Sequence, residues 1–243
     1  MRIQVSPDAL AASRAAADEL GAWLGAPAVA TLVAAAGNSP LELYRLIAAR
    51  GQPVGHLHVF ALDEYVGVPP EDPRTCANLL RRAVAEAWGI PADHFHALSS
   101  RPEEALPSLR QHEEWLSRLG GIDVLVLGLG RNGHLGFNEP GSALDSPGRV
   151  VDLEPVSIAA NARWFDGDHA PAQGVTLGLG RLLAARRVLL VAFGQAKADA
   201  VRKAVIDPPT TDCPGSWLQD HPDATFFVDD EAAAGLPDQR RRG

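Results

Sequence analysis

The sequence predicts an α/β fold in which a mainly parallel sheet is covered by helices on both faces. Short apolar or β-branched runs alternate with longer helical segments along the chain, which is typical of βαβ units. Some short runs, such as Val124–Leu127, are apolar at every position, as expected for strands buried on both faces. Because 243 residues suit one domain with a sizeable core, we expect a single domain over residues 1–243.

The expected strands are short runs, rich in apolar or β-branched residues, that alternate with the helical segments. They are Arg2–Val5, Ala28–Ala35, His58–Leu62, Val124–Leu127, Val175–Leu177, Arg187–Phe193 and Ala224–Val228.

The expected helices fill the longer segments between these strands. Ser6 supplies an N-cap and Pro7 a first-turn proline for a helix that should run to about Leu24. The others are expected at Pro40–Arg50, Thr75–Trp88, Pro102–Leu119, Pro155–Phe165 and Gln195–Ile206.

Composition limits the classes of partner. Thirty acidic against 22 basic residues give a net charge of −8, which disfavours a general nucleic-acid or membrane-surface binder. There is no uninterrupted apolar run of about 18 residues and no signal-peptide pattern. The two cysteines, Cys76 and Cys213, lie far apart, which indicates a reducing compartment and hence the cytoplasm. Residues 240–243 carry a basic run that we expect to be a flexible tail.

Three polar loops follow predicted strands, where ligands bind in open α/β sheets. The first is Gly37-Asn38-Ser39, ahead of the helix expected at Pro40. Backbone N–H groups and the helix dipole suit a phosphate there. The same residue types also occur in strand-to-helix turns for purely conformational reasons.

The second loop begins with Asp63 and Glu64, directly after an apolar strand. Two adjacent carboxylates at a strand end can include a general base. The alternative is that one carboxylate caps a turn while the other is solvated.

The third loop, Gly128 to Pro140, reads GLGRNGHLGFNEP. Its glycines let the backbone approach a ligand, and His134, Asn138 and Glu139 offer titratable or hydrogen-bonding groups. The glycine spacing differs from a dinucleotide fingerprint. A metal site from His134, Glu139 and Asp63 is disfavoured because no second histidine stands at helical spacing. A serine triad is weaker still, since neither Ser39 nor Ser142 lies in a G-x-S-x-G elbow.

Five blocks, in this order and spacing, resemble the glucosamine-6-phosphate deaminase (isomerising) family. They are GNSPLELY, LDEYVG, GLGRNGHLGFNEPGSAL, ANARWF and GQAKADAV. The sister 6-phosphogluconolactonases share the glycine–histidine element but not FNEP, and are the runner-up. The resemblance implies a single-domain, modified Rossmann-like, three-layer α/β/α fold. It also implies conversion of glucosamine 6-phosphate and water to fructose 6-phosphate and ammonia, without a metal or cofactor.

The resemblance also assigns roles to individual residues. Asp63 matches the base that moves a proton between C2 and C1, and His134 matches the residue that assists ring opening together with Glu139. Gly37, Asn38 and Ser39 match the phosphate loop. Arg163 and Lys197 match its two cationic phosphate ligands, and Lys197 is one of only two lysines in the chain.

Two departures from the family pattern bear on chemistry and specificity. Asn132 stands where the family commonly has aspartate, so we expect it to orient the imidazole of His134 without adding negative charge. Asn-Gly-His-Leu-Gly and Thr75-Cys76 look more like the galactosamine-6-phosphate deaminase/isomerase branch, whereas LDEYVG, FNEP and ANARWF favour the gluco substrate.

Regulation and assembly are the remaining expectations. Arg149 is present, but Val151 stands where allosterically controlled members carry a basic residue, so we expect no activation by an N-acetylated sugar phosphate. A homo-oligomer is an open alternative. A non-catalytic sugar-phosphate sensor is a third functional hypothesis, disfavoured because Asp63, His134 and Glu139 are all retained.

Overall fold

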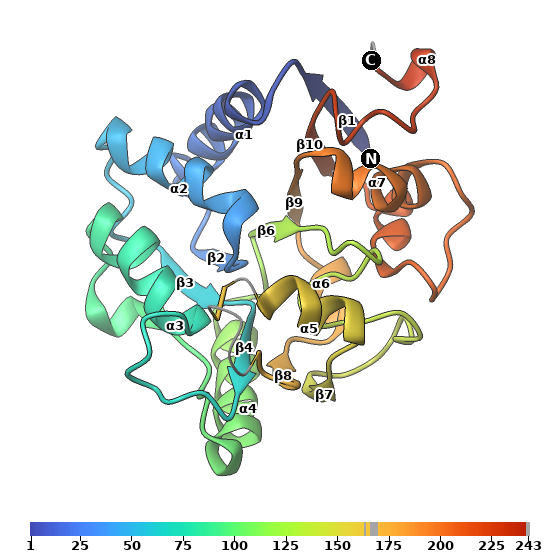
Figure 1. Cartoon of the computed structure of the whole chain (residues 1–243). Coiled ribbons are helices and arrows are strands. Elements are labelled where there is room, and N and C mark those ends of the chain that lie inside the picture. Colours follow the sequence, from blue (N-terminus) through green and yellow to red (C-terminus); the bar gives the residue numbers. More distant parts are fainter. Residues whose placement is uncertain (163, 166–169, 242–243) are drawn as a thin grey trace.

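Seven parallel strands form the central sheet of the protein (Figure 1). The computed structural model describes residues 1–162, 164–165 and 170–241. The strand order is β1-β10-β9-β6-β2-β3-β5, and every neighbouring pair is parallel. The bounds are β1 Arg2–Ser6, β2 Thr31–Ala34, β3 His58–Ala61, β5 Phe95–His96, β6 Val124–Gly128, β9 Arg187–Ala192 and β10 Ala224–Asp229.

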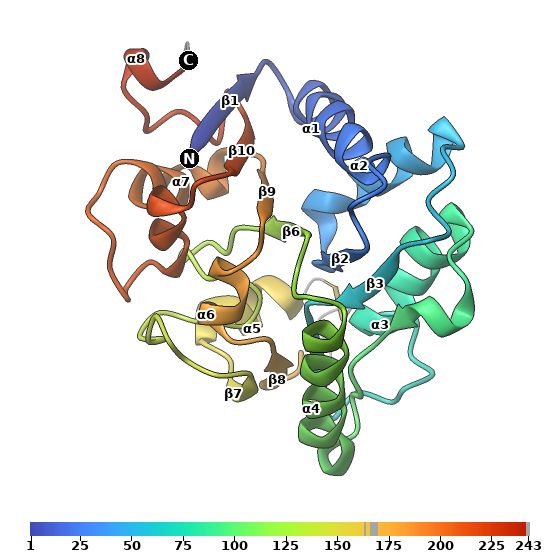
Figure 2. The same ribbon diagram turned by 180° about the vertical axis from the view of Figure 1, so that it is seen from behind.

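Helices cover both faces of this sheet, which confirms the predicted three-layer α/β/α fold. Along β6, Val124 and Val126 pack into one hydrophobic cluster, whereas Leu125 and Leu127 pack into another on the opposite face. The first cluster includes side chains from α1 Ala9–Leu24, α2 Asn38–Arg50 and α3 Cys76–Leu80. The second includes side chains from α4 Pro102–Arg118, α6 Leu179–Leu183 and α7 Ala198–Val205, and Figure 2 shows α4 and α6 on the near side.

A second, antiparallel sheet of three strands was not expected. It has the order β4-β8-β7, with β4 Asp63–Val66, β8 Gln173–Thr176 and β7 Arg149–Asp152. The strand expected at Val175–Leu177 is therefore real, but it overlaps β8 and lies outside the main sheet. The strands β4 and β7 have the sequences DEYV and RVVD, which contain charged residues and did not predict strands. They are strands because both pair with β8.

Several element boundaries differ from expectation for local reasons. Ser6 belongs to β1, and the carboxylate of Asp8 caps α1 by accepting the Ala11 N–H at 2.8 Å. The helix α2 begins at Asn38, two residues before Pro40. The expected helices Thr75–Trp88 and Gln195–Ile206 each change type along their length. The first continues from α3 into a π-helical turn, η1 Arg81–Glu86, and the second starts as a 3₁₀ turn, η3 Gln195–Lys197, before α7.

The remaining elements complete the chain. They are the 3₁₀ turns η2 Ala92–His94 and η4 Pro214–Asp220, and the helices α5 Pro155–Ala162 and α8 Asp238–Arg241. Arg240, part of the expected tail, lies in α8, while residues 242–243 lie outside the described residues. Within the described part of the chain, no helix is both long and apolar enough to cross a membrane.

The strand order reverses its direction of growth between β2 and β6. After β2 the chain adds β3 and β5 on one side, whereas β6, β9 and β10 lie on the other. Loops that leave adjacent parallel strands on either side of such a point diverge and leave a crevice at the carboxyl edge of the sheet. The loops that follow β9, β6, β2 and β3 therefore meet there, and they carry the polar residues singled out from the sequence.

The opposite edge of the sheet is held by Asp123, just before β6. Its Oδ2 accepts the backbone N–H groups of Ala30 and Thr31 at 2.7 and 2.9 Å, and Arg186 binds its other oxygen. Asp123 is buried, so water cannot replace these hydrogen bonds if the carboxylate is removed.

We expect Asp123→Ala to lower the free energy of unfolding by about 3 kcal/mol, because two N–H groups at the start of β2 lose their acceptor. Urea unfolding of the variant and the parent measures this difference. Asp220→Ala, which removes an exposed carboxylate, is the control and should change stability by less than about 0.5 kcal/mol. Equal midpoints for Asp123→Ala and the parent would contradict the assignment.

Candidate functional site

A cavity of about 370 Å³ lies at the carboxyl ends of β2, β3, β6 and β9. Its volume falls in the range of small-molecule sites. The loop after β2 contributes Ala35–Pro40, β4 contributes Asp63 and Tyr65, and the loop after β6 contributes Gly128–Arg131 and His134. Lys197 reaches it from η3, after β9, and Ala160, Asn161 and Trp164 reach it from α5 and the residues that follow. All described residues of the expected site therefore line the cavity except Asn132 and Glu139. These two side chains lie behind His134.

Asp63 begins β4 and lines the cavity, although only 6% of its surface is exposed. The loop after β6 passes directly over its carboxylate. At Gly136, which has φ +58°, an added Cβ would stand 3.2 Å from Asp63 Oδ2 and 3.0 Å from Thr176 Oγ1. Glycine is therefore required at this position by both the backbone conformation and the space.

Burial raises the pKa of Asp63 to about 7, and the neighbouring Glu64 carboxylate adds to the rise. A bond with the side chain of Cys76 opposes it. A carboxyl group that titrates near neutrality can both accept and return a proton at that pH.

Glu64 faces away from this chemistry and holds the start of α3. Its carboxylate accepts the N–H groups of Tyr65, Cys76 and Ala77 at 2.7, 2.9 and 2.7 Å. Burial raises the pKa of Glu64, and these three donors oppose the rise. The sequence left open whether this pair includes a general base or whether one carboxylate serves only as a cap. The structure shows that Glu64 caps a helix.

His134 lines the cavity wall and forms a hydrogen-bonded pair with Glu139 behind it. The imidazole Nδ1 lies 3.1 Å from Glu139 Oε2, and His134 is one-fifth exposed while Glu139 is buried. Burial acts to raise the pKa of Glu139, but its bonds with His134, Ser157 and Asn132 outweigh burial and hold that pKa below its usual value. Glu139 is therefore a carboxylate at neutral pH, suited to bind an Nδ1–H group.

The imidazole ring lies flat against the backbone of Gly130. A Cβ at that residue would approach the ring carbon atoms to 2.4 Å, so any other side chain would displace the histidine. The backbone N–H of Gly130 also donates to the carbonyl of His134 at 3.0 Å, which closes the loop.

Asn132 does not bond to the imidazole, contrary to the expectation from the sequence. Its Nδ2 donates to Glu139 Oε2 at 2.7 Å, and its Oδ1 accepts the backbone N–H of His134 at 3.3 Å. Asn132 therefore acts on the histidine through Glu139 and through the backbone.

The cationic end of the cavity is formed by Lys197 and Arg131. Lys197 Nζ donates to the carbonyl of Leu129 at 2.5 Å, and burial, helped by the positive charge of Arg131, lowers the pKa of Lys197 to about 8. The first turn of α2, including Asn38 and Ser39, lines the same cavity, and no side chain caps that helix. Arg163, the other expected cation, lies outside the described residues.

Other chemistries have little support in this arrangement. Among residues 1–162, 164–165 and 170–241, no group of three His, Cys, Asp or Glu side chains is placed to hold a metal ion. Ser142 Oγ bonds to the Glu139 carbonyl and to Arg149, not to His134, and Ser39 lies in the first turn of α2.

Residues 7–227 match the family model of glucosamine-6-phosphate isomerases/6-phosphogluconolactonase. The chain belongs to this family. It is 38% identical to a glucosamine-6-phosphate deaminase of Streptomyces avermitilis, over 97% of this chain and 93% of the relative. It is also 38% identical to one of Rhodopirellula baltica, over 99% of this chain and 97% of the relative.

Solved structures support the same membership. A monomeric glucosamine-6-phosphate deaminase superposes with a TM-score of 0.92 at 30% identity, covering 97% of this chain and 100% of the other. A 6-phosphogluconolactonase from Trypanosoma cruzi superposes with a TM-score of 0.78 at 21% identity, covering 97% and 96%, which shows the shared fold.

The structure also reveals roles that sequence reasoning missed within the family's FNEP block. Asn138, fully buried, donates through Nδ2 to the carbonyls of Leu135 and Leu177 and accepts from Arg149. It fastens the histidine loop to the end of β8, so it is a structural residue. Arg131 was also missed, although its place beside the histidine motif was a usable signal.

We expect Asn132→Asp to raise the pKa of Glu139. The substitution replaces a donor 2.7 Å from Glu139 Oε2 by a like charge, which favours the protonated acid. Carbon-13 NMR titration of the glutamate carboxyl groups measures the shift, and Glu139→Gln assigns the signal. Asn132→Ala, which removes the donor alone, should give a smaller rise. An unchanged titration in Asn132→Asp would show that Asn132 only shapes the loop.

Proposed function

We propose that this protein is a glucosamine-6-phosphate deaminase, which converts glucosamine 6-phosphate and water to fructose 6-phosphate and ammonia. Similarity to deaminases over almost the whole chain supports the proposal. One observation carries it: a single cavity is lined by a buried carboxyl with a pKa of about 7, by a histidine bonded to Glu139 behind it, and by the cations Lys197 and Arg131.

The cationic end binds the phosphoryl group in this proposal. Lys197, Arg131 and the first-turn N–H groups of α2 supply positive charge and donors around one part of the cavity. Binding energy from this non-reacting group holds the sugar carbons in register with the side chains that act on them. A bound phosphate dianion also favours the charged form of Lys197, whose pKa is lowered to about 8 in the free protein.

His134 opens the pyranose ring. Its Nδ1 is engaged by Glu139, so Nε2 is the ring nitrogen that can exchange a proton with the sugar. Nε2 takes the proton of the C1 hydroxyl and returns a proton to the ring oxygen O5. The ring C1–O5 bond breaks and leaves an aldehyde at C1. Glu139 stabilises the imidazolium that forms transiently.

Asp63 then moves one proton between neighbouring carbons. The C2 hydrogen becomes acidic once the C1 carbonyl exists, and the Asp63 carboxylate removes it. Returning the proton to C1 completes the aldose-to-ketose change and leaves an imine at C2. Water adds to this imine and ammonia leaves, so the C2 ketone of fructose 6-phosphate remains. No electron is gained or lost overall, and the sequence of steps requires only acid–base groups.

The buried positions of Cys76 and Cys213 suit a reducing compartment, and we place the protein in the cytoplasm. The proposed reaction does not depend on association of several copies. The superposed deaminase is monomeric. Because Val151 replaces a basic residue, we also propose that the enzyme is not activated by an N-acetylated sugar phosphate.

We expect ammonia release from glucosamine 6-phosphate to exceed that from galactosamine 6-phosphate, measured side by side with the purified protein. Asp63→Asn should lower kcat by at least about a hundredfold, because the proton acceptor is lost, while inorganic phosphate still binds. Asp93→Asn, at an exposed carboxylate, is the matched control and should leave kcat unchanged.

Three results would contradict the proposal. Faster ammonia release from the galacto epimer would assign the protein to that branch. Accelerated opening of 6-phosphogluconolactone with no ammonia from either hexosamine would make it a lactonase. Binding of hexosamine phosphates without turnover would make it a sensor.

We expect kcat/KM to fall on both sides of a narrow optimum. Below pH 7 Asp63 becomes protonated and loses its capacity to accept the C2 proton, so the rate constant should fall about tenfold per unit. Above pH 8 Lys197 loses its charge, so KM should rise. Lys197→Arg should remove the alkaline limb, because guanidinium stays charged. A flat profile down to pH 5 would contradict the role of Asp63.

A further inference from the structure

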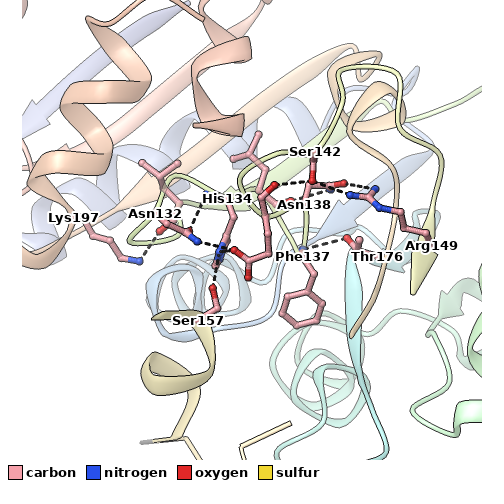
Figure 3. A network of polar contacts seen from close by, with 12 residues as sticks. Asn132, His134, Phe137, Asn138, Ser142, Arg149, Ser157, Thr176 and Lys197 are labelled. Carbon is pink, nitrogen blue, oxygen red and sulfur yellow. Dashed lines mark hydrogen bonds and ion pairs between the residues drawn. The ribbon is translucent and has the colours of Figure 1, made fainter. Parts of the chain in front are cut away.

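Ser157, in the first turns of α5, contacts the His134–Glu139 pair from the side opposite to the histidine loop. It is buried, and its Oγ lies 3.2 Å from His134 Nδ1 (Figure 3). It also lies near enough to the Glu139 carboxylate to help lower the pKa of that group. None of the blocks singled out from the sequence includes this residue.

The donors and acceptors in this group admit one arrangement. Glu139 is ionised and can only accept, so the imidazole donates to it through an Nδ1–H. The hydroxyl oxygen of Ser157 then receives the second part of the Nδ1–H bond at 3.2 Å. With Nδ1 protonated, a neutral imidazole keeps its lone pair on Nε2.

The element that carries Ser157 crosses the edge of the cavity. Ala160 and Asn161 of α5 line the cavity, and Trp164 Nε1 donates to the carbonyl of Arg74 at 2.9 Å. The segment is thus attached at one end to the histidine pair and at the other to the residues that precede α3. The hydroxyl group of Ser157 therefore links the position of α5 to the orientation of the His134 imidazole.

We propose that Ser157 is a positioning residue that, together with Glu139, holds the Nδ1–H edge of His134 and points Nε2 at the sugar. Its role in catalysis rests on the proposed function, whereas its effect on the imidazole does not. Because Ser157 touches neither the cationic end nor Asp63, its loss affects ring opening and leaves phosphate binding unchanged.

The first test is nitrogen-15 NMR of the histidine rings in the free protein at pH 8. In the parent, the His134 signals should report Nδ1 protonated and Nε2 unprotonated. Ser157→Ala should shift the Nδ1 signal, because Nδ1–H loses one of its two acceptors, whereas Ser157→Thr, which keeps a hydroxyl at the same atom, should restore the parent spectrum. His134→Gln assigns the signals.

The second test is steady-state kinetics with glucosamine 6-phosphate. Ser157→Ala should lower kcat about tenfold, the typical effect of one hydrogen bond to a charged group, with KM within twofold of the parent. Ser157→Thr should recover most of kcat. Ser13→Ala is the matched control, since Ser13 is also a buried helical serine and its Oγ donates to the Ala9 carbonyl at 2.7 Å, far from the cavity.

The outcomes separate the two proposals. A parent-like ring spectrum in Ser157→Ala overturns the positioning role, whatever the activity. Equal losses of kcat in Ser157→Ala and Ser157→Thr with equal melting temperatures overturn it as well. If no ammonia is released by the parent, the proposed function fails while the spectra still decide the role of Ser157.

Discussion

Burial of the Asp63 carboxylate is the constraint on which the site depends. A carboxyl group in contact with bulk water would titrate near 4 and be a poor proton acceptor at neutral pH. The protein removes Asp63 from water by laying Gly136 across it and by pairing β4 with β8. The adjacent Glu64 raises the pKa of Asp63 further. The backbone N–H of Tyr65 and two N–H groups at the start of α3 in turn donate to Glu64 and offset its own burial.

The surroundings of Glu139 in the histidine loop shift its pKa in the opposite direction, downwards. Glu139 is also buried, but His134 and Asn132 donate to it, and these contacts together with nearby Ser157 hold its pKa low. Two carboxylates of one site are thereby assigned different protonation behaviour by their partners: Asp63, in the cavity, exchanges a proton near neutrality, whereas Glu139, behind His134, stays charged and orients the histidine. This separation of acid–base roles by environment is a recurring property of catalytic sites.

The uneven distribution of charge suits an anionic substrate. The chain carries a net charge of −8, yet Lys197 and Arg131 are grouped at one end of the cavity. Partial burial of Lys197 lowers its pKa to about 8, so its side chain stays mostly charged at neutral pH. A bound phosphate favours the charged form further. Local grouping, not net charge, therefore determines which ligand the cavity favours.

The sequence by itself determined the layered α/β fold, because short apolar runs such as Val124–Leu127 alternate with longer helical segments, and that alternation is typical of a parallel sheet covered on both faces. It also placed Asp63, His134 and Lys197 at strand ends, since the parallel topology brings those ends to one edge. Only the tertiary structure decided which partner each side chain meets. The strands DEYV and RVVD exist through pairing with β8, Asn132 bonds to Glu139 instead of the imidazole, and Ser157 reaches His134 across 23 positions of the chain. Such contacts depend on distances between loops that no local pattern encodes, because hydrogen bonding is directional and short-ranged whereas the hydrophobic pattern is neither.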